Sequence, residues 1–195
     1  SLRAFDSFRQ ITFLQRASLL RTIASELKLE EERLLQAASQ ETHLSIPRLK
    51  SELMRTCYQL TAYAQACEEA SWMDIRIDTE KKSLQPPRPD LRKTMIPLGP
   101  VIVFGASNFP FAYSTVGGDT ASALAAGCSV VVKAHPAHPL ASEISAACIQ
   151  RALRIEGLSS DLFQHITGSR EELAKALVQH PATKAVGFTG SFSGG

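Results

Sequence analysis

The sequence lacks the patterns that define several common classes of protein. Its four cysteines (Cys57, Cys67, Cys128 and Cys148) form no Cys-x-x-Cys pair, which argues against a zinc or disulfide framework and is typical of reduced thiols. No apolar run approaches the ~20 residues that cross a bilayer, and the N-terminus has no signal-peptide layout. We therefore expect a cytoplasmic protein that does not contact membranes.

A strong charge of either sign is also missing. The 21 basic and 19 acidic residues leave a net charge of +2, which provides no electrostatic footprint for nucleic acid. Repeats and low-complexity segments do not stand out. The chain has 195 residues, 44% of them hydrophobic, enough for one sizeable domain or two small ones with a true core.

The two best-known nucleotide motifs are absent as well. There is no Gly-x-Gly-x-x-Gly fingerprint, and no Gly-Lys dipeptide exists for a Walker sequence. His135 and His138 lie among prolines, with no nearby cysteine or cluster of carboxylates. We therefore expect no metal site.

What the sequence does contain divides into segments of different pattern. Residues 1–70 are expected to be helical, because apolar residues recur at helical spacing. Residues 71–100 are expected to form strands at 73–78 and 91–96, joined by a loop with three prolines. The helical stripes consist of Leu20, Ile23, Ala24 and Leu27, then Leu34, Leu35 and Ala38, then Leu49, Leu53, Cys57, Leu60 and Ala64.

From residue 101 onward, strands alternate with helices. Apolar strands are expected at 101–106, 129–135, 162–167 and 184–190, with helices at 140–155 and 170–179. A further helix is expected after Asn108, ending near Ala126 with Gly127 as its cap. Continuous Val/Ile runs alternating with helices predict an α/β fold with a Rossmann-like parallel sheet over 101–195.

In such sheets ligands bind beyond the carboxyl ends of the strands. The segments at those positions are 105–108, 133–136, 168–170 and 190–195. Their small residues, amide, lysine and arginine suit a nucleotide, whose phosphates bind backbone N–H groups at helix N-termini. Each segment also has a plainer interpretation: an ordinary glycine turn, a solvated Lys133, a surface Arg170.

Three motifs in this order and spacing resemble the aldehyde dehydrogenase superfamily. They are FGASNFP at 104–110, Val132-Lys133, and FTGS at 188–191. The run at 117–139 is similar to the branch that includes dehydrogenases of 2,5-dioxovalerate (α-ketoglutaric semialdehyde) and NADP-preferring fatty aldehyde dehydrogenases. The resemblance covers essentially the whole chain.

The resemblance implies roles for particular residues. Asn108 matches the asparagine whose side-chain amide stabilises the substrate oxygen when a thiol attacks the aldehyde. The residues that it implies for NAD or NADP are Gly105, Ala106, Ser107, Lys133, His135, Pro136, Arg170, Gly190, Ser191 and Gly195. Pro136 stands where many NAD-preferring relatives have a ribose-binding glutamate, so NADP should be tolerated. Phe109, Phe111 and Tyr113 are candidates for the aldehyde pocket, although helix–sheet packing would explain them equally well.

The resemblance also implies what is missing. In relatives the nucleophilic cysteine and the general-base glutamate lie beyond the FTGS turn, so we expect the 195 residues alone to be inactive and to belong to a larger enzyme. That enzyme would oxidise an aldehyde, 2,5-dioxovalerate first and a fatty aldehyde as the alternative. It would act as a homo-oligomer, a dimer or tetramer, through the strands of 71–100. A non-catalytic nucleotide-binding or subunit-interaction module is the alternative of another class.

Overall fold

The computed structural model describes residues 2–192 and 194. The described chain contains seven α-helices and six strands, plus two 3-10 turns at Ser71–Met73 and Ser160–Leu162. None of these helices combines the length and the apolarity that a membrane crossing requires. The elements are α1 (Leu2–Phe8), α2 (Phe13–Leu29), α3 (Glu31–Thr42), α4 (Ile46–Glu69), β1 (Arg76–Asp78), β2 (Leu91–Lys93), β3 (Val101–Phe104), α5 (Gly118–Ala125), β4 (Val130–Lys133), α6 (Pro139–Ile155), β5 (Phe163–Ile166), α7 (Glu171–Gln179) and β6 (Ala185–Phe188).

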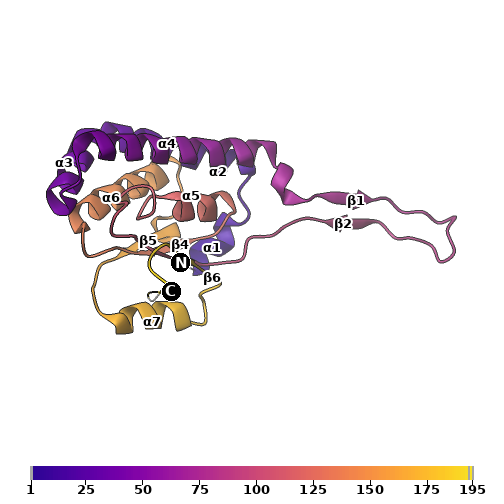
Figure 1. Ribbon diagram of the computed structural model, residues 1–195. Coiled ribbons are helices and arrows are strands. Elements are labelled where there is room, and N and C mark those ends of the chain that lie inside the picture. Colours follow the sequence, from indigo (N-terminus) through magenta and orange to yellow (C-terminus); the bar gives the residue numbers. More distant parts are fainter. Residues whose placement is uncertain (1, 193, 195) are drawn as a thin grey trace.

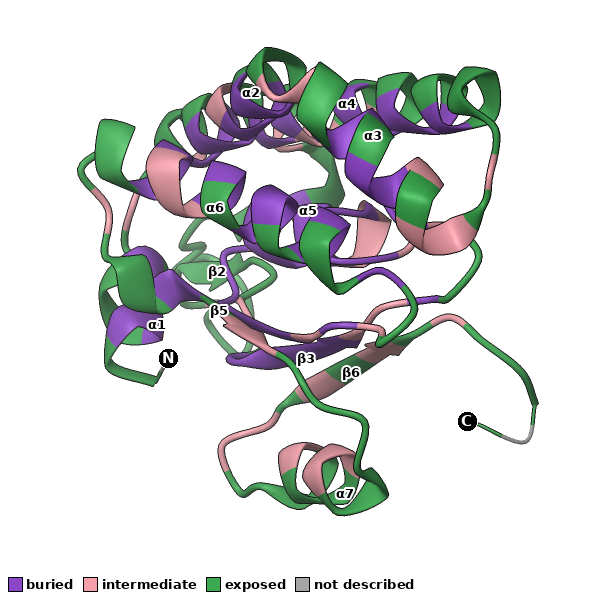
Figure 2. Cartoon of the chain, turned by 90° about the vertical axis from the view of Figure 1, so that its left-hand side faces the viewer, coloured by how far each residue is buried: buried purple, intermediate pink, exposed green. Residues whose placement is uncertain are grey.

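The predicted α/β fold is confirmed. Strands β3, β4, β5 and β6 form a parallel sheet in the order β5-β4-β3-β6. Helices α5 and α6 cover one face of this sheet, and α2, α3 and α4 form a further layer above them (Figure 2). Helix α7 lies on the opposite side of the sheet.

The helical segment is built as its apolar stripes predict. Every residue of the three stripes is buried. Helix α2 begins with a capping box, in which Thr12 and Gln15 each bond the other's backbone N–H. The short helix α1 lies within the segment expected to be helical and buries Ala4, Phe5 and Phe8.

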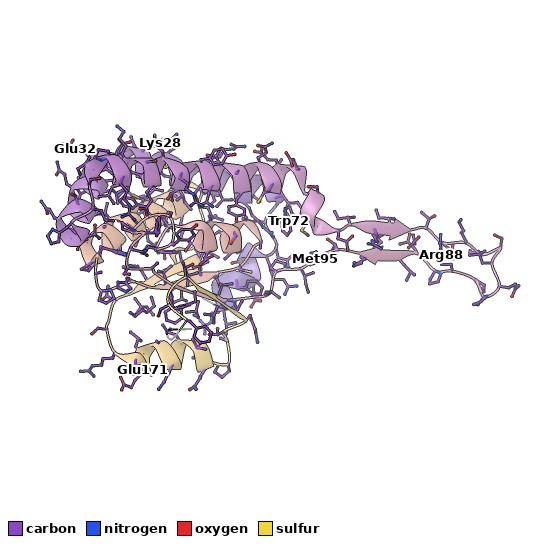
Figure 3. All side chains as sticks on the ribbon, viewed as in Figure 1. Lys28, Glu32, Trp72, Arg88, Met95 and Glu171 are labelled. Carbon is purple, nitrogen blue, oxygen red and sulfur yellow. The ribbon has the colours of Figure 1, made fainter. Side chains whose placement is uncertain are left out.

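Residues 71–100 form a hairpin that projects from the body of the molecule (Figure 1). Strands β1 and β2 pair antiparallel, with Ile77 opposite Arg92. The expectation of a strand from residue 73 is wrong at its start. Met73 is buried in a 3-10 turn, and Asp74 has a φ of 46°, which interrupts extended backbone. In Figure 3, Trp72 and Met95 mark the base of the hairpin, and Arg88 lies farther out.

The expectation of a helix directly after Asn108 is also wrong. Residues 109–117 form a series of turns, and α5 starts at Gly118. The backbone N–H groups of Phe111 and Ala112 both donate to the Glu52 carboxylate, 2.8 and 2.9 Å away. Because a side chain from α4 binds these donors, the backbone folds into turns that keep Asn108 beside the sheet.

Candidate functional site

The carboxyl ends of the four parallel strands lie in one row. Register pairs Phe104 with Lys133 on one side and with Phe188 on the other. Lys133 in turn pairs with Ile166. The segments predicted to bind a ligand therefore follow neighbouring strands and emerge at the same edge of the sheet.

The turn after β3 is held closely against the protein. A Cβ on Gly105 would lie 2.7 Å from the Ser114 hydroxyl oxygen, so close packing alone requires glycine there. The Ala106 N–H donates to the Tyr113 carbonyl at 2.8 Å, and the Ala106 side chain is buried. Ser107 and Asn108 are exposed at the end of this turn.

A groove of ≈ 390 Å³ opens between the turn after β3 and the turn after β6. Residues of the first and the last of the three motifs, FGASNFP and FTGS, line this groove. Gly195 and Ser193 lie outside the described residues, so the second half of the predicted phosphate turn is not described. The groove is lined by Ala106, Ser107, Asn108, Phe109, Tyr113, Thr189, Gly190 and Ser191.

Helix α4 supports the segment that carries Asn108. Arg48 donates from Nη2 to the Asn108 carbonyl oxygen at 2.9 Å, and Glu52 binds the two N–H groups that follow. Glu52 is buried, and its burial raises the pKa of the carboxyl, although the hydrogen bonds from Ala112 and Phe111 oppose the shift. In the sequence, the only sign that Glu52 holds this turn was the place of an acidic residue beside the apolar stripe of α4.

His138 holds the other side of the same turn. Its side chain is fully buried; Nε2 lies 2.8 Å from the Ala106 carbonyl oxygen and Nδ1 lies 3.1 Å from the Ser142 hydroxyl. Because a carbonyl only accepts, Nε2 carries the proton. The sequence weighed His138 only as a metal ligand and missed this structural role.

Lys133 is the last residue of β4, and His135 and Pro136 follow the strand. Lys133 is half-buried, and burial lowers the pKa of its ammonium group. Within residues 2–192 and 194, its Nζ has no hydrogen bond or ion pair, so a donor remains free for an incoming ligand. The pKa of His135 is lowered by burial first and then by the charges of His138 and Lys133. Pro136 is exposed.

Arg170 is exposed and directly precedes α7. The structure does not bring it into the Asn108 groove. Instead α7 and the sheet edge enclose a second groove of ≈ 540 Å³, which sequence reasoning missed. Its walls include Phe104 and Phe188, whose rings meet edge-to-face at 6.2 Å between centroids. Further lining residues are Ala174, Val178, Val186 and Gly194, together with the polar Glu171, Lys175 and Gln179.

None of the four cysteines is suited to act as a nucleophile. All are buried. Burial raises the pKa of the Cys57 and Cys67 thiols and raises that of Cys148 to about 11. A thiol held in its protonated form is a poor nucleophile.

Comparisons with known proteins agree with these motifs. The profile of the aldehyde dehydrogenase family matches residues 1–195. The chain is 45% identical over 193 residues to α-ketoglutaric semialdehyde dehydrogenase 2 of Azospirillum brasilense, covering 98% of this chain and 37% of that protein. It is 45% identical over 194 residues to α-ketoglutaric semialdehyde dehydrogenase of Acinetobacter baylyi, covering 99% of this chain and 36% of that protein. The chain thus spans little more than a third of the length of these relatives.

Solved structures share the fold. A salicylaldehyde dehydrogenase from Pseudomonas putida G7 superposes with a TM-score of 0.85 at 19% identity, over 100% of this chain and 38% of that one. The glyceraldehyde-3-phosphate dehydrogenase GapN from Methanocaldococcus jannaschii, complexed with NADP, superposes with a TM-score of 0.78 at 18% identity, over 97% of this chain and 39% of that one.

Proposed function

The chain belongs to the aldehyde dehydrogenase family, and from this premise we propose that it is the N-terminal part of an enzyme that oxidises an aldehyde to a carboxylic acid with NAD or NADP. The observation that carries the proposal is the groove in which Asn108 faces the turn at residues 189–191. An exposed amide on a turn held by Arg48 and Glu52 is a preorganised hydrogen-bond donor. Such a donor stabilises charge that develops on a substrate oxygen.

The residues at this edge of the sheet fit a dinucleotide. The free Lys133 ammonium suits ribose hydroxyls or a phosphate, and in the groove between α7 and Phe188 the apolar side chains of Phe104, Val178 and Val186 could contact a flat ring, beside the polar Glu171, Lys175 and Gln179. Arg170 stands at the start of α7, and Gly190 and Ser191 lie after β6. NAD(P) supplies the hydride acceptor when it is bound. With an exposed Pro136 in place of a carboxylate, a 2′-phosphate meets no repulsion at that position, so we expect NADP to be used.

The substrate that the relatives favour is 2,5-dioxovalerate. Both 45%-identical relatives are named α-ketoglutaric semialdehyde dehydrogenases. The fatty aldehyde alternative has less support, because Phe111 is fully buried and cannot line a tunnel for an alkyl chain. Phe109 and Tyr113 do line the Asn108 groove.

We propose the same division of the chain as the sequence predicted. Residues 1–70 and 101–195 form the cofactor-binding part, and residues 71–100 serve contacts between subunits of a homo-oligomer. The hairpin and the segment that leads from it to β3 expose large apolar side chains, which a second copy of the chain would cover. They are Ile75, Ile77, Leu91, Met95, Ile96 and Leu98. The nucleophilic cysteine and general-base glutamate would lie in the part of the enzyme outside this chain.

The decisive experiment replaces Asn108 in the full-length enzyme. The change Asn108→Ala removes one oxyanion donor, so kcat for 2,5-dioxovalerate should fall by ~10²–10³-fold. The melting temperature should stay the same, because the side chain is exposed. Production of NADH and NADPH at 340 nm measures the rate with each cofactor.

Two results would contradict the proposal. A full-length enzyme that oxidises no aldehyde with either cofactor would favour the non-catalytic nucleotide-binding or subunit-interaction module. Detectable aldehyde oxidation by the purified 195 residues would show that the nucleophile lies within them.

A further inference from the structure

A further pocket, separate from the groove beside α7, adjoins the Asn108 groove and is lined by charged side chains. Its volume is ≈ 340 Å³, and it lies between α4 and the turns that follow Asn108. Phe109 and Tyr113 line both the pocket and the Asn108 groove, so the two spaces share a wall. The other side chains of the pocket are Arg48, Ser51, Glu52 and Arg55, with Ala112.

Two arginines flank this pocket. Arg48 and Arg55 are seven residues apart, two helical turns, and therefore lie on the same face of α4. The Arg48 guanidinium carbon lies 5.2 Å from the centre of the Phe109 ring, and that of Arg55 lies 5.3 Å from the centre of the Tyr113 ring. The two rings meet perpendicularly with centroids 5.2 Å apart. Each charged group is thus positioned by an aromatic ring that also faces the groove.

Both guanidinium groups keep donors free. Arg48 donates one hydrogen bond, to the Asn108 carbonyl. Arg55 donates two, to the Gln59 side chain at 3.1 Å and to the Tyr113 hydroxyl at 3.3 Å. A guanidinium has five N–H donors. In the part of the chain that the structure describes, neither arginine forms an ion pair with a carboxylate.

Glu52 is the acidic residue that lines this pocket, and a negative charge on it would repel a bound anion. Its Oε1 accepts the N–H groups of Phe111 and Ala112. Its Oε2 is buried and has no hydrogen-bond partner among the described residues. Burial raises the pKa of this carboxyl, whereas the hydrogen bonds from Ala112 and Phe111 and the charge of Arg48 oppose the shift, so neighbouring groups offset part of a charge on Glu52.

We propose that the pocket binds the anionic end of the substrate, a carboxylate, while the aldehyde end of the same molecule lies at Asn108. Arg55 is the principal contact and Arg48 the second, and Phe109 and Tyr113 guide the short carbon chain between the two ends. The inference rests on the proposed function and assigns residues to its choice of substrate. Forked N–H donors match a carboxylate geometrically. A long alkyl chain in this pocket would have to displace water from two charged groups, which is unfavourable.

The test compares two aldehydes of equal length in the full-length enzyme. They are 5-oxopentanoate, which carries a carboxylate, and pentanal, which does not. The variant Arg55→Met removes the charge and spares the contact with Asn108, which only Arg48 makes. We expect kcat/KM for 5-oxopentanoate to fall ~10–100-fold, mostly through KM, because a charge-assisted bidentate contact is lost. For pentanal we expect less than about a threefold change.

Two further variants act as controls. Arg55→Lys keeps the charge but not the fork, so it should recover part of the lost kcat/KM for 5-oxopentanoate. Arg154→Met removes an exposed arginine from the last turn of α6 and should leave both aldehydes unaffected. Glutarate carries the same carboxylate, so we expect it to inhibit competitively and to lose affinity in Arg55→Met by a factor similar to that for 5-oxopentanoate.

The outcomes separate the two proposals. An equal loss with both aldehydes in Arg55→Met, or a wild-type enzyme that prefers pentanal, overturns the carboxylate pocket and leaves the proposed function standing. Oxidation of no aldehyde by the wild-type enzyme, 2,5-dioxovalerate included, overturns the proposed function. In that case, calorimetric titration of the wild type and Arg55→Met with glutarate decides the pocket, and equal affinities would overturn it.

Discussion

The two faces of the parallel sheet differ sharply in how they are packed. Helix α6 on one face has nine buried residues, among them Ile149 and Cys148 at 0% exposure. Helix α7 on the other side has no buried residue (Figure 2). The edge strand β6 follows the same trend, since Val186 and Phe188 remain 44% and 43% exposed.

The packed side of the sheet supports the candidate site, and the open side leaves room for a ligand. Groups on the packed side hold the Asn108 turn: Glu52 binds Phe111 and Ala112, and His138 lies against the Ala106 carbonyl. The open side carries α7 and the groove beside it that we assign to the cofactor. A ligand site needs surface that the protein itself does not cover, so low burial there is what the proposed function requires.

The largest expected effect comes from truncating matched aliphatic side chains on the two sides. Ile149→Ala should lower the free energy of unfolding by ~2–5 kcal/mol, because it leaves a cavity in the packed layer. Val178→Ala in α7, where the side chain is 46% exposed, should cost less than ~0.5 kcal/mol. Urea denaturation measures both. Similar losses for the two variants would show that α7 is as well packed as α6.

Two histidines, His138 on the packed side of the sheet and His180 after α7, offer a second comparison of the two sides. His138→Ala leaves the Ala106 carbonyl without its buried partner and should cost ~1–3 kcal/mol. In the full-length enzyme it should also lower kcat by as much as ~10²-fold, because the Asn108 turn loses its position. His180→Ala, at an exposed position after α7, is the control and should change neither quantity. A His138→Ala enzyme with normal stability and kcat would refute this role.

Substitution of Glu52 should have the smallest effect on the stability of the protein, and this effect should depend on pH. Since burial raises its folded-state pKa above the usual 4.5, the group's contribution is full below that value and is lost as the pH rises through the raised pKa. The stability of the wild type relative to Glu52→Gln should therefore decrease as the pH rises above the usual 4.5, as urea midpoints at several pH values would reveal. Glu52→Ala also removes the acceptor of two N–H groups and should be less stable than Glu52→Gln throughout. A relative stability of the wild type that rises with pH would contradict the assignment.

Much of the fold could be predicted because local sequence reports it directly. The apolar stripes of α2, α3 and α4 became the core, and the Val/Ile runs became β3 and β4. The segments that could bind a ligand were predicted from their places after strands, where parallel topology brings them together, and the roles of single residues were predicted from the resemblance to the family.

Other features could not be predicted because they depend on contacts between distant residues. The turns at 109–117 replace the expected helix because Glu52, ~60 positions earlier, binds their N–H groups. The strand expected from residue 73 starts late because Asp74 adopts a positive φ. His138 was considered only as a metal ligand and rejected as one, and its buried hydrogen bonds to Ala106 and Ser142 became visible only in the structure.

The sequence by itself determined the element order, the family and the identity of the candidate donor Asn108, because periodicity and motifs are written along the chain. Only the tertiary structure decided which side chains surround that donor. Arg48 and Arg55 lie far from Asn108 in sequence and carry no motif, yet α4 places them beside it. The physical reason is that a binding pocket depends on distances in space, which packing sets and local sequence does not encode.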